Sequence, residues 1–154
     1  MLACVGDRDG DGYGDIAQWS PVVSALDYTE RLGGRGRIRT GSYGSEPDTP
    51  AGIAVGDFNA DGRSDLVYWL PDGRGWLTPG APSPPRLPAG REIAECPPRP
   101  YDPSQRFSAT VSDVNDDGYD DLTFSVVGSR TPLASTRMLG GPEGLSPARC
   151  APLP

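Results

Sequence analysis

Three short segments of the chain place carboxylates at a spacing that suits a hard metal cation. The segments are Val5–Ile16 (VGDRDGDGYGDI), Val55–Leu66 (VGDFNADGRSDL) and Val111–Leu122 (VSDVNDDGYDDL), and they align without gaps. Counted from the first aspartate, each reads D-x-[DN]-x-D-G-x-x-D, with side-chain oxygens at positions 1, 3, 5 and 9. Calcium prefers about six to eight oxygen ligands, and a tightly curled loop can turn alternate side chains inward. The spacing therefore predicts a calcium loop in each segment.

Each predicted loop uses four side chains and the backbone carbonyl at position 7. Glycine at position 6 permits the sharp turn, because it tolerates positive φ. Bound divalent ions would also offset the repulsion among crowded carboxylates in a chain of net charge −7. With about three calcium ions in all, one per loop, the predicted ligands are Asp7, Asp9, Asp11, Tyr13 (carbonyl) and Asp15; Asp57, Asn59, Asp61, Arg63 (carbonyl) and Asp65; and Asp113, Asn115, Asp117, Tyr119 (carbonyl) and Asp121.

Other interpretations of the same loops fit less well. Asp-Gly-rich stretches also form ordinary solvated turns, but three copies in one register weigh against that reading. Magnesium demands octahedral geometry and keeps its waters. An EF-hand needs a glutamate at position 12 and flanking helices, whereas position 12 here is Gln18, Tyr68 or Phe124 in strand-like surroundings.

The loops recur at a period that leaves room for about four short strands per unit. Their first aspartates, Asp7, Asp57 and Asp113, lie 50 and 56 residues apart. Stretches rich in β-branched and aromatic residues flank each loop, and 66–70 and 122–127 carry apolar groups on both alternating faces. We therefore predict an all-β fold of three tandem four-stranded repeats, at 1–50, 51–105 and 106–154, in one structural domain, with 66–70 and 122–127 as largely buried strands.

Two parts of the chain are harder to assign. Residues 20–34 combine a helix signature, with serine, proline and a closing glycine pair, with the valines and tyrosine of a strand; the repeat favours a strand. Trp76–Leu77 and 137–139 are predicted third strands, and 93–94 begins a fourth. The proline-rich stretches 79–88, 97–103 and 147–154 are predicted connectors.

Composition excludes several classes of protein. With 21 glycines and 18 prolines among 154 residues, the chain cannot be a helical bundle, since both residues break helices. The absence of histidine removes Ser-His-Asp triads, Cys-His dyads and histidine-ligated zinc. The acidic balance argues against nucleic acid, and the chain has no apolar run of membrane-spanning length.

At the level of motifs, the chain resembles the FG-GAP and VCBS repeats, the blade units of integrin-α-type β-propellers. The run 56–66 (GDFNADGRSDL) is very close to that family's pattern, and 139–146 (LGGPEGLS) is similar to its later GG-x-x-GLS segment. The resemblance implies a calcium loop between the first two strands of each four-stranded blade, and extracellular roles in adhesion or in glycan or protein binding. Such propellers usually close with more blades than three, so the resemblance implies a partial propeller or one completed by oligomerisation.

From these features we expect a binding or adhesion module that is extracellular or at the cell surface, and not an enzyme. No signal peptide is present in this chain, and no pair of carboxylates outside the metal positions suggests acid–base catalysis. Its expected partners are a glycan or protein ligand, or further copies of itself. Two alternatives stay open: a structural unit whose copies associate into a ring or stack, and an accessory fragment of a larger secreted enzyme.

The cysteines and tryptophans give little further information about function. Cys4, Cys96 and Cys150 make an odd number, so pairing within the chain would leave one thiol over, and the sequence does not fix which residues pair. Trp19 and Trp69 occupy the same place in their repeats, where we expect core packing rather than contact with a sugar.

Overall fold

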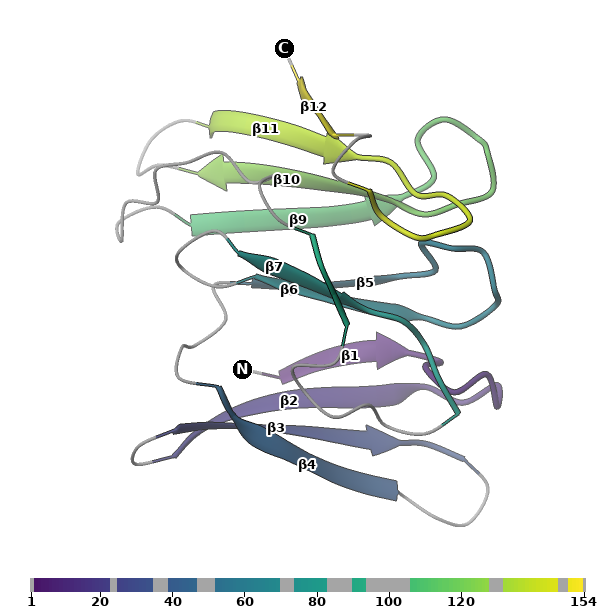
Figure 1. The fold of residues 1–154 in the computed structure, drawn as a ribbon, viewed down its shortest axis with the longest axis vertical. Coiled ribbons are helices and arrows are strands. Elements are labelled where there is room, and N and C mark those ends of the chain that lie inside the picture. The colour runs from purple at the N-terminus through teal and green to yellow at the C-terminus, as the bar shows by residue number, and fades with distance from the viewer. Residues whose placement is uncertain are drawn as a thin grey trace.

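The chain folds into three four-stranded antiparallel sheets, each following chain order across the sheet (Figure 1). The computed structural model describes residues 2–22, 25–34, 39–46, 52–69, 74–82, 90–93, 106–127, 132–146 and 150–153. Sheet 1 holds β1 (Leu2–Gly6), β2 (Asp15–Val22), β3 (Ala25–Leu32) and β4 (Arg39–Glu46); sheet 2 holds β5 (Gly52–Gly56), β6 (Asp65–Trp69), β7 (Gly75–Thr78) and β8 (Arg91–Glu92); sheet 3 holds β9 (Arg106–Ser112), β10 (Asp121–Val127), β11 (Pro132–Met138) and β12 (Cys150–Leu153). The predicted all-β class is confirmed.

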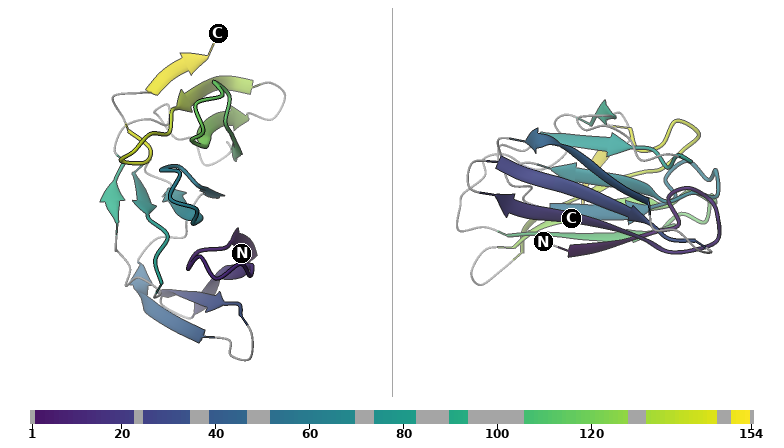
Figure 2. Two further views of the ribbon diagram at one scale, coloured as in Figure 1. Left: turned by 90° about the vertical axis from the view of Figure 1, so that its right-hand side faces the viewer. Right: turned by 90° about the horizontal axis from the view of Figure 1, so that it is seen from below.

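The three sheets stack face to face in chain order, with sheet 2 in the middle (Figures 1 and 2). Their first strands, β1, β5 and β9, lie side by side, whereas the last strands, β4, β8 and β12, lie farther apart from one another (Figure 2). The loops that join the first two strands of each sheet emerge at the same edge of the stack (Figure 1). This arrangement places the three acidic loops next to one another.

Two sequence assignments are settled by the strands. The segment 20–34 forms the end of β2 and the whole of β3, with residues 23 and 24 outside the described residues, so the strand interpretation is confirmed. The assignment of 147–154 as a connector was wrong in part, since Cys150–Leu153 forms β12. Pro152 is compatible with this assignment because β12 is an edge strand of sheet 3, and proline within sheets is found mainly on edge strands.

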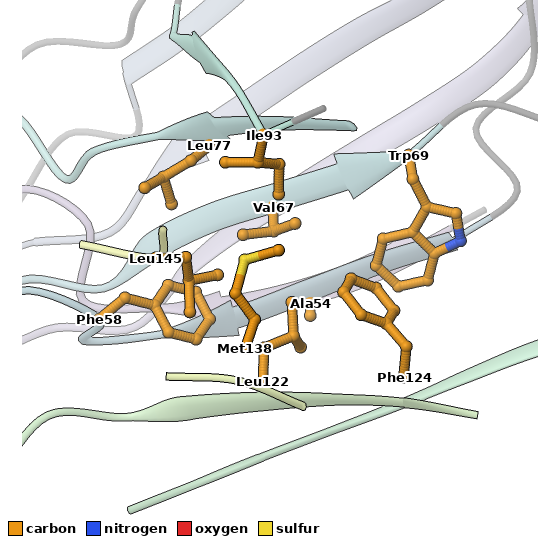
Figure 3. Close-up of a cluster of buried hydrophobic side chains, with 10 residues drawn as sticks. All are labelled: Ala54, Phe58, Val67, Trp69, Leu77, Ile93, Leu122, Phe124, Met138 and Leu145. Carbon is orange, nitrogen blue, oxygen red and sulfur yellow. The ribbon is translucent and has the colours of Figure 1, made fainter. Parts of the chain in front are cut away.

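The described core lies between sheets 2 and 3 (Figure 3). Trp69 of β6 meets Phe124 of β10 edge to face, with ring centroids 4.7 Å apart at 86°. Burying a large apolar side chain completely contributes about 1.5–3 kcal/mol, so this cluster is a principal stabilising contact between the sheets. Its members are Ala54, Phe58, Val67, Trp69, Leu77, Ile93, Leu122, Phe124, Met138 and Leu145. The core role expected of Trp69 is confirmed; the side chain of Trp19 lies outside the described residues.

The second strands of sheets 2 and 3 are buried differently. All five residues of β6 are buried, because sheets 1 and 3 cover its two faces, as its unbroken apolar run predicts. In β10 burial alternates over the described side chains: Leu122 and Phe124 are buried, whereas Thr123 and Ser125 are only half-buried. The prediction of a largely buried strand is confirmed for the described side chains of β10, with one face buried and the other half-buried.

Candidate metal centre

In all three loops the carboxylate at position 1 organises the turn. Asp7, Asp57 and Asp113 each accept a hydrogen bond on Oδ1 from the backbone N–H of position 5 and one on Oδ2 from that of position 6, at 2.7–3.1 Å. The aspartate therefore curls the chain around its own carboxyl group. The local fold follows from the short reach of this side chain to the N–H groups that follow it.

Positions 3 and 5 continue the same pattern. The side-chain oxygen at position 3 accepts from the N–H of position 5, and the carboxylate at position 5 accepts from the N–H of position 7, at 2.9–3.4 Å. In loops 2 and 3 the amides of Asn59 and Asn115 also donate to Asp61 and Asp117, at 3.2 and 3.0 Å. In those two loops the position-3 and position-5 side chains thus contact each other directly.

The curl of the loops requires two left-handed residues each, of which the sequence pattern revealed one. The position-6 glycines Gly12, Gly62 and Gly118 have φ of 85°, 81° and 86°, as expected. Position 4 is left-handed as well, with φ of 77° at Gly10, 55° at Ala60 and 58° at Asp116. Because position 4 is a different residue in each loop, its constraint left no signal in the motif; Ala60 in particular is strained there.

The aspartate at position 9 lies beneath the loop and is buried, at 0% exposure for Asp15 and 1% for both Asp65 and Asp121. One of its oxygens accepts from the backbone N–H of position 2 at 2.6–3.2 Å. The other accepts from the N–H of a glycine that follows the third strand, Gly33, Gly80 or Gly140, at 2.7–2.9 Å. This carboxylate therefore fastens the loop to the third strand of its own sheet.

The glycines after the third strand also let the neighbouring loop come close. A Cβ on Gly80 would lie 3.0 Å from the carbonyl oxygen of Arg8 in loop 1, and one on Gly140 would lie 3.0 Å from that of Phe58 in loop 2. The N–H of Gly141 donates to the same Phe58 carbonyl at 3.0 Å. At Gly140 the GG pair of the sequence marks this position, but the sequence does not show which loop approaches it, and Gly80 stands in no such pair.

Backbone hydrogen bonds also join each loop to the next. The N–H of Ser64 donates to the carbonyl of Asp7 at 2.8 Å, and the N–H of Asp120, at the same position of loop 3, donates to that of Asp57 at 3.1 Å. The carboxylate of Asp120 accepts the N–H of Asp57 at 2.8 Å. The three loops thus form a connected row along one edge of the stack.

Position 2 inserts a side chain between adjacent sheets. Phe58 is fully buried in the core against sheet 3. Arg8 is 1% exposed, and its Nη1 donates to the carbonyls of Ser64 in loop 2 and Thr78 in β7 at 3.2 and 2.9 Å. Position 2 holds a charged residue in loop 1 and apolar residues of different size in loops 2 and 3, so this role could not be seen in the sequence.

The closest gathering of acidic oxygens in the described part of the chain is in loop 1, where Asp7, Asp9 and Asp15 offer ligand atoms within 4.8 Å of one another. Asp11 is not part of this group of carboxylates; at position 7, Tyr13 is exposed and Arg63 and Tyr119 are half-buried. Desolvation, followed by repulsion from Asp11 and Asp15, raises the pKa of Asp9. Desolvation also raises the pKa of Asp65 to about 6, against hydrogen bonds from Gly80 and Phe58 that lower it.

The donor set fits a hard cation. Every candidate side chain offers oxygen, which suits calcium or magnesium rather than zinc or copper. The raised pKa values show carboxylates in surroundings that disfavour their negative charge, which a bound cation would compensate. The loops are also closed turns before any ion is considered, because backbone N–H groups already hold their carboxylates.

No family model matches this chain, and the search of curated proteins finds no match. Among the described residues, none forms a helix that could cross a membrane.

Proposed function

We propose that the chain is a calcium-binding module of FG-GAP/VCBS type, in which the three sheets are propeller blades and each acidic loop binds one calcium ion. Its work is recognition or adhesion outside the cell, with a glycan or a protein as ligand, rather than catalysis. The observation that carries the proposal is the convergence of Asp7, Asp9 and Asp15 within 4.8 Å in a loop whose hydrogen-bond pattern is repeated twice more.

Calcium is favoured over magnesium by the shape of the loops. A loop that takes its oxygens from alternate residues of one curled segment supplies many ligands with little rigidity, which suits the larger and less demanding ion. The ligands would be the side chains at positions 1, 3, 5 and 9 with the carbonyl at position 7. Free calcium is abundant outside cells, where weak sites fill.

The proposed action of the ion is to order the repeat. Position 9 is tied to the glycine after the third strand, and position 1 to the next loop, so a cation held between them would fasten a loop, a sheet and its neighbour together. Ligand binding to the native state alone adds RT ln(1 + [L]/Kd) to stability, about 2.7 kcal/mol per site at a hundredfold excess over Kd. The row of loops would then be rigid enough to present a binding surface.

The test is calorimetric titration with calcium, combined with thermal unfolding in saturating calcium and in excess chelator. About three ions should bind, and chelation should lower the unfolding midpoint by well over about 5 °C. Asp61→Ala should remove one binding site and part of the shift, whereas the exposed Glu92→Ala in β8 should remove neither. Unfolding that ignores calcium, or equal behaviour of the two variants, would show the loops to be plain turns.

A further inference from the structure

The outer face of sheet 3, which points away from sheet 2, differs from the matching face of sheet 2. Alignment of the loops and the strand pairings Ala54↔Val67↔Leu77 and Thr110↔Thr123↔Arg137 place the two faces in register. In sheet 2 this face packs into the core against sheet 3. The residues Ala54, Val67, Trp69 and Leu77 of sheet 2 correspond to Thr110, Thr123, Ser125 and Arg137 of sheet 3. Each of these four apolar residues is thus replaced by a polar one.

The polar groups of this outer face bond to one another within the sheet. The hydroxyls of Ser125 and Ser135 lie 3.0 Å apart across β10 and β11, and Nε of Arg137 donates to Oγ1 of Thr123 at 3.4 Å. All four side chains are half-buried, and Thr110 and Ser108 on β9 are exposed. These polar groups of β10 and β11 are therefore partnered within their own sheet.

The residue before the loop shows the same change. Gly56 faces sheet 3 so closely that a Cβ would lie 2.5 Å from Cγ1 of Val111 and 2.9 Å from Oδ2 of Asp120, and a Cβ on Gly6 would collide with Ser64. In sheet 3 this position is Ser112, which is exposed. The residue before the loop is therefore glycine in sheets 1 and 2, on which the next sheet packs closely, and serine in sheet 3.

Position 2 of the loops agrees. Arg8 and Phe58 insert into the following sheet and are 1% and 0% exposed, whereas Val114 is 39% exposed. Valine is also smaller than either of its counterparts. The large side chain that fills the contact between sheets 1 and 2 and between sheets 2 and 3 therefore has a smaller counterpart on sheet 3.

We propose that the outer face of sheet 3 is a water-facing cap that ends the stack, and that neither a second copy of this chain nor a further sheet of the repeat type packs on it. Covering the face would strip water from the guanidinium of Arg137 and from a row of hydroxyls, which is costly without new polar partners. Repeat arrays need such polar terminal faces to stay soluble. The inference weighs against completion of a ring by copies that dock on sheet 3.

The proposal does not depend on calcium, so its test is made both in saturating calcium and in chelator. Thr123→Glu and Thr110→Glu on the cap are compared with the same substitutions at the matching core positions, Val67→Glu and Ala54→Glu. The cap variants should keep the unfolding midpoint within about 3 °C of the wild type, as surface changes do, and the core variants should lose tens of degrees or the folded state. Sedimentation over a hundredfold range of concentration should give the same mass for the cap variants and the wild type.

Two results would overturn the proposal. One is a loss of stability in Thr123→Glu or Thr110→Glu comparable to that of the matching core variants. The other is a wild-type oligomer that the cap variants dissociate, which would make this face an interface between copies. An oligomer that persists unchanged in the cap variants would use another surface and would support the cap. Failure of calcium to stabilise the protein would leave all of these comparisons intact.

Discussion

Each acidic loop has two parts that look alike in sequence and differ in surroundings. The crown consists of positions 1, 3 and 5, whose carboxylates and amides bond to the loop's own N–H groups near the surface. The foot is the position-9 aspartate, Asp15, Asp65 or Asp121, which is buried and bridges position 2 to the glycine after the third strand. The oxygens that converge in loop 1 come from both parts, Asp7 and Asp9 of the crown and Asp15 of the foot, but only the foot is also needed for the fold without an ion.

The largest effect is expected from removing a foot. Asp65→Ala leaves the buried N–H groups of Phe58 and Gly80 without this acceptor, and each bond to a charged group is worth about 1.5–3 kcal/mol. We expect a loss of about 3–5 kcal/mol, or about 10 °C or more in midpoint, in chelator as well as in calcium. Urea unfolding of both states measures it.

The matched crown variant is Asp61→Ala, at position 5 of the same loop. In chelator it should change stability by less than about 1 kcal/mol, because both hydrogen bonds it loses, from the N–H of Arg63 and from the amide of Asn59, are exposed. In calcium it should lose the contribution of one ion. Equal losses for Asp61→Ala and Asp65→Ala in chelator would erase the distinction between crown and foot.

The division between crown and foot explains which features of the loops could be predicted from the sequence. Positions 1, 3, 5 and 6 act on residues two to five places along the chain, so the motif itself carries their geometry. The foot was picked out as a ligand, but its burial was not visible, since its partner Gly80 is 15 residues away and Gly33 and Gly140 are 18 and 19 residues from theirs. Hydrogen bonds between residues a few places apart can be predicted from the loop motif, whereas those to a distant glycine cannot.

The same limit applies to the strands. The β-branched and aromatic composition of 122–127 correctly predicts β10, because threonine suits a strand as well as valine does. Which face is covered depends on whether another sheet follows, and the alternation of Leu122 and Phe124 with Thr123 and Ser125 held that information. Weighing polarity along with strand propensity would have predicted one covered face.

A second, smaller effect is a pH dependence whose sign differs between the calcium-free and calcium-bound protein. The pKa of Asp65 is raised from 3.8 to about 6 in the fold, chiefly by desolvation. The folded state then binds the proton more tightly than the unfolded state, so the calcium-free protein should gain stability as the pH falls from about 7 toward about 4, by on the order of 2 kcal/mol. In calcium the same acidification should destabilise, because protons compete with the ion for the crown.

Urea midpoints measured across this pH range, with chelator and with calcium, give both slopes. Asp65→Asn cannot titrate and should flatten the rise in chelator, while Asp61→Asn, which removes one of the charges that raise the pKa of Asp65, should reduce the rise only in part. A calcium-free protein that loses stability steadily on acidification would refute the assignment of the dependence to the foot.

The smallest effect tests the backbone of the crown alone. Ala60 occupies position 4 of loop 2 with φ of 55°, where an L-residue other than glycine costs roughly 1 kcal/mol. Loop 1 has Gly10 at this position with φ of 77°. Ala60→Gly should therefore stabilise the protein by up to about 1 kcal/mol, reduced by the greater freedom that glycine has in the unfolded chain. Ala54→Gly in β5, which has no such strain to relieve, should destabilise it.

The result bears on the ion as well as on the chain. If the left-handed turn at position 4 is formed before calcium arrives, as the hydrogen bonds to Asp57 indicate, the gain from Ala60→Gly should be the same in chelator and in calcium. If calcium itself forces the turn, the variant should gain only when calcium is bound, and its affinity should rise with it. Paired urea titrations of Ala60→Gly and the wild type separate a crown that is preformed from one that the ion must build.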